Sequence, residues 1–257
     1  MSRILDTAVL AAEMAGQFLS EKFGRVTSIE RKADTSLVTE VDKRAEQIVV
    51  DVIRENFPRH SICAEERGLD SKDGDWLWII DPLDGTHNFI RSIPLYGVSI
   101  GVAHNNEFVA GVIYLPSEEE FFVAEKGSGA FKNDRKIKVS SVNGLQDASM
   151  GFDSTLKVNS SAKSQVMSGF AREVFNVRMF GSSARNLTFI AEGKLDLVIE
   201  FDDHLWDFGG AACIISEAGG SITDFSGKPA LPVDGQRYIA SNGLIHAQAI
   251  NLMQKLV

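Results

Sequence analysis

Apolar residues near the start of the chain recur at helical spacing. From Ile4 to Phe23 most of them are three or four positions apart, and Gly24 offers a stop, so the pattern predicts an amphipathic helix. A second helix is predicted from Thr39, a good N-cap with Asp42 three positions later, to the proline at position 58. The chain is therefore expected to open with two helices.

The pattern then changes to short apolar runs that are typical of strands. These runs cover residues 61–64, 76–80, 96–103, 108–115 and 120–124, and they predict an antiparallel sheet with a hairpin at residues 104–107. After residue 140, strands at 177–180, 195–201, 221–224 and 238–240 alternate with helices at 162–174, 184–192, 208–218 and 244–256. We expect an α+β half over residues 1–140 and an α/β half over residues 141–257, packed as one body with a cleft between them.

Composition and charge narrow the class of protein. Among the 257 residues, 44% are hydrophobic and 24% are charged, which is typical of a globular chain, and the net charge of -9 argues against a nucleic-acid partner. No apolar run approaches the roughly 20 residues that span a bilayer, and no secretory signal is evident. Cys63 and Cys213 lie far apart in apolar surroundings, where we expect reduced core side chains. These features favour a cytoplasmic protein without a membrane partner.

The sharpest chemical signal follows the apolar run at residues 76–80. Asp81 and Asp84 occur there in the sequence Asp-Pro-Leu-Asp-Gly-Thr, so two carboxylates can point at one hard cation while the amides of Gly85 and Thr86 face an anion. A metal ion and a phosphate could meet at such a turn. The alternative is a solvated Asp-Pro turn in which Asp84 caps a short helix.

Three other acidic positions are open to two interpretations as well. Glu65 and Glu66 end an apolar strand. If the pair is buried, a bound cation is needed to offset the repulsion between the two carboxylates; the alternative is that both face water. Asp207 opens an apolar helix and could be its N-cap. Asp42, at the end of the segment 34–42, could be a first-turn acid that interacts with the helix dipole.

In combination, these four blocks resemble the inositol monophosphatase family, part of the lithium-sensitive, Mg²⁺-dependent phosphatase superfamily. The aspartate near a helix start, the Glu-Glu pair, the Asp-Pro-x-Asp-Gly-Thr core followed by Asn-Phe, and a late Trp-Asp occur in the family order, from about residue 32 to about residue 227. The resemblance implies a layered αβαβα sandwich of the inositol monophosphatase / fructose-1,6-bisphosphatase type. It also implies a homodimer.

The resemblance further implies a set of metal ligands that are all oxygen atoms. Glu65, Asp81 and the carbonyl of Leu83 would hold one Mg²⁺ ion. Asp81, Asp84 and Asp207 would hold a second, and a third, weaker ion is expected near Glu65. Ligands of this kind select Mg²⁺ or Mn²⁺ over zinc.

By the same resemblance, Asp42, Glu65 and Thr86 form the catalytic set. Thr86 with Asp42 would orient and deprotonate the attacking water, and the amides of Gly85 and Thr86 would bind the phosphate. Two cations that clamp the attacking and leaving oxygens would allow an acidic protein to bind a phosphomonoester.

Substrate contacts are expected from Asp84, Ser182, Ser183, Arg185 and Glu200. Glu200 lies seven residues before Asp207, where the family has a glutamate that binds substrate hydroxyls, although it could be a strand-end surface acid and the serines could only cap their helix. The chain departs from the family at His87 and Arg185. His87 could alter leaving-group preference or be an exposed surface histidine, and Arg185 could offer its guanidinium to a second phosphate or to a partner subunit.

The expected function is hydrolysis of a small polyol or sugar phosphate by metal-activated water, with myo-inositol 1-phosphate as the leading substrate. Fructose 1,6-bisphosphate, histidinol phosphate and 3′-phosphoadenosine 5′-phosphate are the alternatives on the same scaffold. An aspartyl-phosphate mechanism is disfavoured because two residues, not one, separate Asp81 from Asp84. A regulatory binding protein that keeps the fold is the alternative from another class.

Overall fold

Two helices form the first layer of the molecule. The computed structural model describes residues 2–26, 28–31, 37–233 and 236–257. Helix α1 (Arg3–Lys22) and helix α2 (Glu40–Asn56) match the two predicted helices. The hydroxyl of Thr39 accepts hydrogen bonds from the first amides of α2, and the Asp42 carboxylate accepts one from the Thr39 amide at 2.8 Å, so the predicted cap is confirmed as a capping box. Residues 34–36 of the same segment lie outside the described residues.

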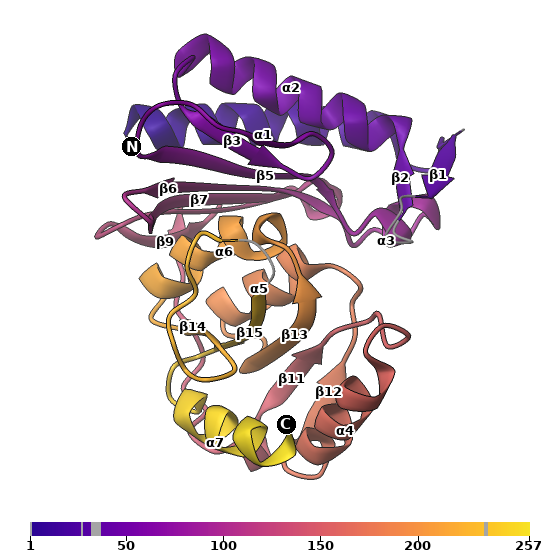
Figure 1. Ribbon diagram of the computed structural model, residues 1–257, viewed down its shortest axis with the longest axis vertical. Helices are drawn as coiled ribbons and strands as arrows, with labels where there is room; N and C mark the ends of the chain where they lie inside the picture. The colour runs from indigo at the N-terminus through magenta and orange to yellow at the C-terminus, as the bar shows by residue number, and fades with distance from the viewer. Residues whose placement is uncertain (1, 27, 32–36, 234–235) are drawn as a thin grey trace.

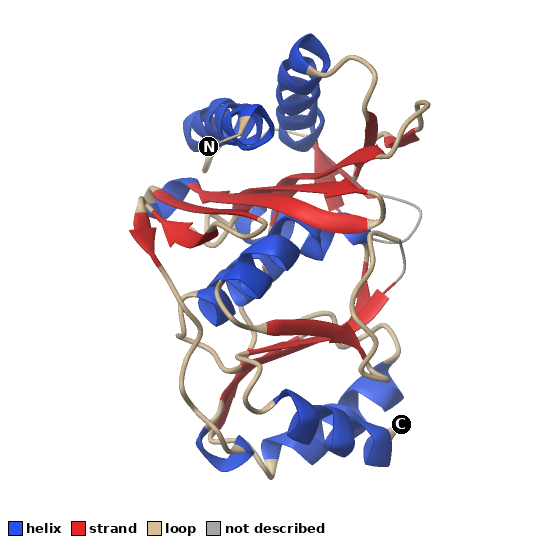
Figure 2. Ribbon diagram, turned by 90° about the vertical axis from the view of Figure 1, so that its left-hand side faces the viewer, coloured by secondary structure: helices blue, strands red, loops and turns tan. Residues whose placement is uncertain are grey.

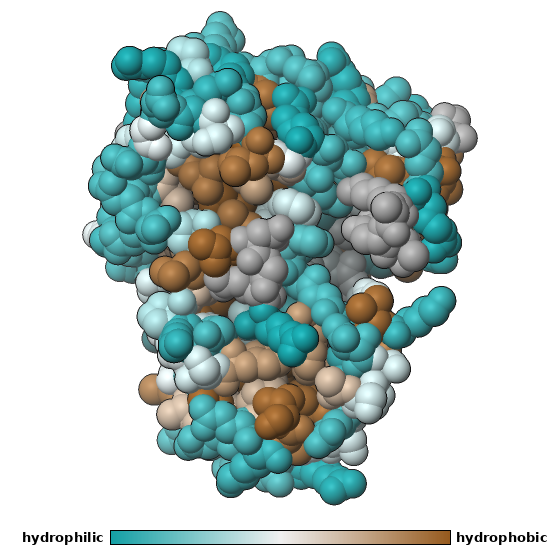
Figure 3. Space-filling model, in the orientation of Figure 1, coloured by the Kyte–Doolittle hydropathy of each residue, from teal (hydrophilic) through white to brown (hydrophobic). Residues whose placement is uncertain are grey.

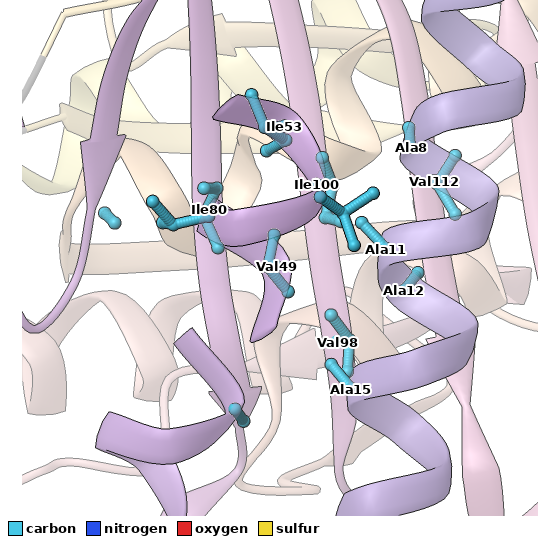
Figure 4. Packing of buried hydrophobic residues seen from close by; sticks show 14 of the residues in the cluster. Ala8, Ala11, Ala12, Ala15, Val49, Ile53, Ile80, Val98, Ile100 and Val112 are labelled. Atoms are coloured by element: carbon cyan, nitrogen blue, oxygen red, sulfur yellow. The ribbon is translucent and has the colours of Figure 1, made fainter. Parts of the chain in front are cut away.

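Alanines on one face of α1 let this helix lie close to the sheet beneath it. Figure 4 shows these alanines in one cluster with branched side chains of three strands and of α2, and all the labelled residues are buried: Ala8, Ala11, Ala12, Ala15, Val49, Ile53, Ile80, Val98, Ile100 and Val112. The outward faces of both helices are mostly hydrophilic in the space-filling view (Figure 3). The amphipathic pattern in the sequence therefore corresponds to one buried and one solvated face.

An eight-stranded sheet lies under the two helices, in the order β10-β9-β8-β7-β6-β5-β3-β4. Its strands are β3 (Ser61–Ala64), β4 (Gly68–Asp70), β5 (Trp76–Asp84), β6 (Gly97–His104), β7 (Glu107–Leu115), β8 (Glu120–Glu125), β9 (Gly129–Lys132) and β10 (Arg135–Lys136). The predicted hairpin is confirmed, because β6 and β7 are joined by Asn105 and Asn106 with φ of 51° and 61°. A short pair, β1 (Ile29–Arg31) with β2 (Leu37–Thr39), lies apart from this sheet.

The prediction of a purely antiparallel sheet is wrong for one pair of strands. β3 and β5 run parallel, with Ser61 opposite Leu77 and Ala64 opposite Ile80. The chain forms β4 along one edge of β3 and then returns through residues 71–75 to pair β5 with the other edge. The parallel pairing brings the carboxyl ends of β3 and β5 to the same edge of the sheet.

The second sheet has five strands in the order β12-β11-β13-β15-β14. They are β11 (Ser149–Phe152), β12 (Asn176–Arg178), β13 (Leu197–Asp203), β14 (Ser221–Asp224) and β15 (Gln236–Ser241). The remaining helices are α3 (Thr86–Ile90), α4 (Ser160–Ala171), α5 (Ser183–Ala191), α6 (Leu205–Glu217) and α7 (His246–Leu256), with 3-10 turns at Pro116–Glu118 and Leu145–Asp147. The predicted alternation of strands and helices in this half is confirmed.

The elements stack in five layers (Figures 1 and 2). α1 and α2 cover the outer face of the first sheet, α5 and α6 lie between the two sheets, and α4 and α7 cover the outer face of the second. This is the expected layered αβαβα sandwich. α6 packs on β6 and β7, so the second half of the chain contacts the first sheet. The division into halves at residue 140 stays a prediction.

Glycines bring α6 into backbone contact with the first sheet. A Cβ atom added at Gly101 of β6 would overlap the carbonyl of Gly209, and one added at Gly111 of β7 would overlap the carbonyl of Gly210. Gly210 itself lies against the side chain of Ser99. This close approach holds the first turn of α6 next to the sheet that ends in the Asp-Pro-Leu-Asp segment.

Both cysteines are free and buried, as predicted for reduced core residues. Burial raises the pKa of the Cys213 thiol to about 12. In a Cys63→Ser variant at pH 8, the thiolate fraction of Cys213 should therefore be on the order of 1 in 10,000. We expect no labelling by a thiol reagent over an hour in native protein and complete labelling in denaturant; rapid labelling of native protein would contradict this burial.

Among the described residues, no helix combines the length and the apolar character needed to cross a bilayer.

Candidate active site

A cavity of about 780 Å³ opens between the two sheets. It is bounded by the end of β5, the start of α3, a loop at residues 153–157, the turn before α5, the end of β13 and the first turn of α6. Seven carboxylates are among its lining residues: Glu65, Asp81, Asp84, Asp153, Glu200, Asp203 and Asp207. The basic residues in the described lining are His87 and Lys157, so this cavity is strongly acidic.

A bulge at the end of β5 aims two of these carboxylates into the cavity. Asp81 is opposite Ser99 and Asp84 is opposite Gly97, so three steps along β5 match two steps along β6. In a regular strand, residues three apart point to opposite faces of the sheet. The extra residue removes that alternation, and Pro82, which has no amide proton, is suited to such a break in the ladder.

Asp81 lies at the centre of the acidic group. Its Oδ1 atom accepts a hydrogen bond from the Leu83 amide at 3.0 Å. Burial raises the pKa of Asp81 well above its ordinary value, and the charges of Glu65, Asp84 and Asp207 raise it further. A group of carboxylates that destabilise each other's charge in this way would be stabilised by a cation.

Asp84 is held by the turn before α5. It accepts hydrogen bonds from the Ser182 hydroxyl and from the Ser183 amide, the latter at 2.9 Å. The alternative that Asp84 caps the short helix after it is wrong, because α3 is preceded by Gly85 without a side-chain cap. Burial raises the pKa of Asp84 to about 6, although these hydrogen bonds act in the opposite direction.

Glu65 and Asp207 approach the same region from a strand and a helix. Glu65 follows β3, and its amide bonds to the carbonyl of Ile80 at 3.2 Å, which places it beside the end of β5. Asp207 is not the N-cap of α6: His204 is the cap, and the Asp207 carboxylate accepts a hydrogen bond from the His204 amide at 2.6 Å. Burial is the main cause of its raised pKa, followed by the charges of Asp203 and Glu65.

Asp42 and Thr86 are in contact, as the resemblance implies. Thr86 Oγ1 lies 2.9 Å from Asp42 Oδ1 and 3.0 Å from the carbonyl of Leu83. The second oxygen of Asp42 accepts hydrogen bonds from Thr39, and Asp42 also lies in the first turn of α2, as the alternative of a first-turn acid proposed. Burial raises the pKa of Asp42.

Gly85 has the left-handed conformation, with φ of 80° and ψ of 34°, at the point where the chain turns from β5 into α3. A Cβ atom there would lie 2.6 Å from the carbonyl of Leu95. Only glycine therefore suits this position. The exposed His87 lines the cavity one turn further on, where burial of its ring and then the charge of Arg91 lower its pKa.

The sequence-based analysis did not single out Asn88 as a link between the two walls of the cavity. Its side-chain amide donates to the carbonyls of Leu95, Phe180 and Gly181 at 2.9, 2.8 and 3.1 Å. Asn88 thereby ties the turn after β5 to the turn before α5, which is 92 residues away in the chain. Its place in the Asn-Phe dipeptide after the core motif was the only available signal.

The second wall contains the expected substrate residues, with one exception. Ser182 is the N-cap of α5, which was the alternative to substrate contact for this serine, and its hydroxyl also donates a hydrogen bond to Asp84. Glu200 is 4% exposed and lines the cavity, so it is not a surface acid. Asp153 and Asp203 complete the wall and carry no sequence signal that could have identified them.

Arg185 is the exception, because the structure does not bring it to the cavity. Its guanidinium is buried, lies 2.9 Å from Glu120 Oε2 and packs at 4.0 Å over the ring of Phe189. Glu120 belongs to the first sheet, so this ion pair joins α5 to β8. The arrangement favours a structural role over contact with a substrate phosphate.

An Arg185→Ala variant should therefore lose stability but not substrate affinity. Removing the guanidinium takes a cation away from the partly buried Glu120 and leaves a space over the ring of Phe189. Together we expect these changes to lower the unfolding free energy by about 2–3 kcal/mol. Chemical denaturation measures the loss, with exposed Arg172→Ala as the control. A large rise in KM at unchanged stability would show instead that Arg185 contacts substrate.

The oxygen donors around Asp81 fit a hard divalent cation. Glu65, Asp84 and Asp207 act on the charge of Asp81 and, like the Leu83 carbonyl, offer oxygen alone. Within the described chain, no three acidic, histidine or cysteine side chains are already gathered into a closed metal cage. Asp81, Asp84 and Asp207 each accept a hydrogen bond from a backbone amide, which fixes the direction of their carboxylates.

The layered fold and the acidic cavity define the class of protein, a phosphatase-type α/β sandwich. A family model described as the inositol monophosphatase family matches residues 1–257, and the chain belongs to this family.

Individual relatives match over nearly the whole chain. A Thermotoga maritima protein named fructose-1,6-bisphosphatase/inositol-1-monophosphatase is 35% identical over 254 residues, which cover 98% of this chain and 96% of the relative. The Escherichia coli Nus factor SuhB is 32% identical over 261 residues, covering 100% and 98%. The crystal structure of the extragenic suppressor protein SuhB from Bartonella henselae superposes with a TM-score of 0.93 at 31% identity, covering 100% of both chains. The expected family and fold are therefore confirmed.

Proposed function

We propose that the protein is a metal-dependent phosphomonoesterase whose substrate is a small polyol phosphate, with myo-inositol 1-phosphate first among the candidates. One observation carries the proposal: the carboxylates of Glu65, Asp81, Asp84 and Asp207 gather in one cavity, where the charges of the other three raise the pKa of the buried Asp81. The relative named fructose-1,6-bisphosphatase/inositol-1-monophosphatase supports the same class of substrate.

The metal ligands are proposed as the sequence implies them. Glu65, Asp81 and the Leu83 carbonyl hold one Mg²⁺ or Mn²⁺ ion, and Asp81, Asp84 and Asp207 hold a second. Bound there, the cations offset the charge of the phosphate and lower the pKa of a water molecule. A third ion near Glu65 is part of the same proposal.

Thr86 and Asp42 orient and deprotonate the attacking water. The Thr86 hydroxyl donates its hydrogen to Asp42, so the lone pairs of Thr86 Oγ1 can accept a hydrogen bond from the attacking water. As the water gives its proton to Thr86, the threonine proton passes to Asp42. The raised pKa of Asp42 favours this transfer. Gly85 and Thr86 bind the phosphate through their amides, while Glu200 accepts hydrogen bonds from hydroxyls of the leaving group.

The test is phosphate release from myo-inositol 1-phosphate, fructose 1,6-bisphosphate, histidinol phosphate and 3′-phosphoadenosine 5′-phosphate, with Mg²⁺, with EDTA, and with Mg²⁺ plus lithium. We expect Mg²⁺-dependent release that is fastest from the inositol ester and is inhibited by millimolar lithium. Preference for another ester would change the substrate but not the chemistry. No release from any ester would contradict the proposal and favour a regulatory binding protein, as the Nus factor name of one relative suggests for that relative.

The homodimer, the cytoplasmic location and the number of ions stay predictions. Light scattering and calorimetric titration with Mg²⁺ measure the first and the last of them.

A further inference from the structure

Two carboxylates at the end of β13 face the cavity although they are three residues apart. Glu200 is opposite Tyr238 and Asp203 is opposite Gln236 on β15, so three steps along β13 match two steps along β15. This bulge has the same step count as the bulge between Asp81 and Asp84 on β5. It turns both Glu200 and Asp203 toward the cavity, against the alternation of a regular strand.

The neighbouring acid, Asp202, points elsewhere. Its carboxylate binds the ammonium of Lys163 at 2.9 Å and the side-chain amide of Asn159 at 2.6 Å. Lys163 is fully buried and also binds Asp153, on the 153–157 loop, at 2.5 Å. The buried ammonium of Lys163 is thereby already engaged with two carboxylates, and Asp202 and Asp203 have different environments although they are adjacent.

Each of the two cavity carboxylates is anchored through one oxygen. Asp203 Oδ2 accepts hydrogen bonds from the Tyr238 hydroxyl at 2.8 Å and from the Ser183 hydroxyl at 3.2 Å. Glu200 Oε1 accepts one from the Asn186 amide at 3.0 Å. Within the described part of the chain, the other oxygen of each residue accepts none, so two fixed hydrogen-bond acceptors remain on this wall.

We propose that Asp203 is a specificity-determining residue that, together with Glu200, binds neighbouring hydroxyl groups of the substrate's leaving group. The inference rests on the proposed phosphatase function. Two carboxylate oxygens held by hydrogen bonds at the end of one strand suit the donors of a diol, since an ionised carboxylate accepts but cannot donate. Where they are ionised, the two groups repel an anion, so a second phosphate is disfavoured at this wall.

The substrate class that follows is a polyol monophosphate with free hydroxyls opposite the ester. Lys157 is a basic residue of the cavity lining. It is exposed and lies on the 153–157 loop, not on β13. In the part of the chain that the structure describes, the donors to Asp203 are Tyr238 and Ser183, both on Oδ2, so Oδ1 remains available to a hydroxyl donor.

The experiment compares Asp203→Asn with wild type on two esters, both with saturating Mg²⁺. One ester is myo-inositol 1-phosphate, and the other is p-nitrophenyl phosphate, whose leaving group has no hydroxyl donors. The asparagine keeps the shape and can still accept from Tyr238, but it loses the charge. We expect KM for the inositol ester to rise about tenfold with kcat changed less than twofold, which is the loss of one charge-assisted hydrogen bond, and no change for p-nitrophenyl phosphate.

Asp202→Asn is the matched control, because it removes an adjacent carboxylate that lies outside the cavity. It should leave KM for both esters unchanged. If Asp203→Asn fails to fold, Tyr238→Phe is the second variant, since it removes only the hydroxyl that anchors Asp203. For Tyr238→Phe we expect a rise of about threefold in KM for the inositol ester alone.

Three results would overturn the inference. If Asp203→Asn raised KM equally for both esters, Asp203 would act only on the fold. If it changed KM for neither ester, Asp203 would contact no hydroxyl. Wild-type hydrolysis of the inositol ester distinguishes both of these from failure of the proposed function. Absence of wild-type hydrolysis of any ester would overturn the proposed function and this inference with it.

Discussion

An Asp81→Asn variant is expected to lose its phosphatase activity by far more than 100-fold while it keeps its fold. Loss of a residue that only orients a metal ligand lowers metal affinity or activity by about 10- to 100-fold. Asp81 is itself the proposed ligand of two ions, so its loss should have a larger effect. Asparagine has the same shape but no charge, so it leaves two cations with one anionic ligand fewer. Phosphate release at saturating Mg²⁺, together with calorimetric titration of Mg²⁺, measures the effect.

The stability of the same variant provides an independent test. Asp81 is 2% exposed and is destabilised in its charged form by three neighbouring carboxylates. A neutral side chain relieves that repulsion, so the metal-free variant should have a Tm equal to or above that of the metal-free wild type. The exposed Asp73→Asn serves as the control and should be fully active. An active Asp81→Asn enzyme would rule out the metal assignment.

A Gly210→Val variant is expected to be the most destabilising single change of those considered. The carbonyl of Gly210 lies against Gly111, and a side chain at position 210 would overlap the Ser99 hydroxyl and the backbone of Ile100. Because backbone atoms cannot move aside as a flexible side chain can, α6 must shift away from the sheet. We expect a loss of at least about 3 kcal/mol in unfolding free energy, and loss of activity in any folded fraction.

Gly169→Ala is the matched control for this prediction. Gly169 is also in a helix, but an added Cβ would meet only the side chain of Leu256 near the end of the chain. Alanine also has the higher helix propensity, so this variant should be within about 1 kcal/mol of wild type. Thermal unfolding followed by circular dichroism distinguishes the two, and a Gly210→Val protein as stable as wild type would contradict the close packing.

The sequence predicts most of the long elements because their burial pattern is regular. α1 and α2 each have one continuous buried face, which leaves a helical period in the sequence. The central strands β5 and β6 are buried at nearly every position, which leaves unbroken apolar runs instead. β1, β4 and β10 have two or three residues each, too few to show a period, and were not predicted. The parallel pairing of β3 with β5 depends on which edge of β3 the chain returns to, and local sequence does not encode that choice.

The site was predicted to a similar extent. The residues of the proposed metal-binding wall follow a recognisable spacing, whereas Asp153 and Asp203 face the cavity because of a loop and a bulge, which have no pattern of their own. Arg185, which was expected to contact the substrate, differs from these residues because the structure places its guanidinium away from the cavity lining. A lone arginine near a glycine-serine turn looks functional in sequence, and only the structure shows Glu120 and Phe189 beside it.

Asn88 has a consequence for how the two walls of the cavity act together. Its buried amide group is bonded to both walls, and two of its three hydrogen bonds, to Phe180 and Gly181, must break if the walls are to separate. A preorganised cavity of this kind needs little free energy to close around its ligand. The free energy released when hydroxyls bind at one end can therefore align the ester with its nucleophile at the other, and a remote part of the ligand can contribute to the rate of bond cleavage.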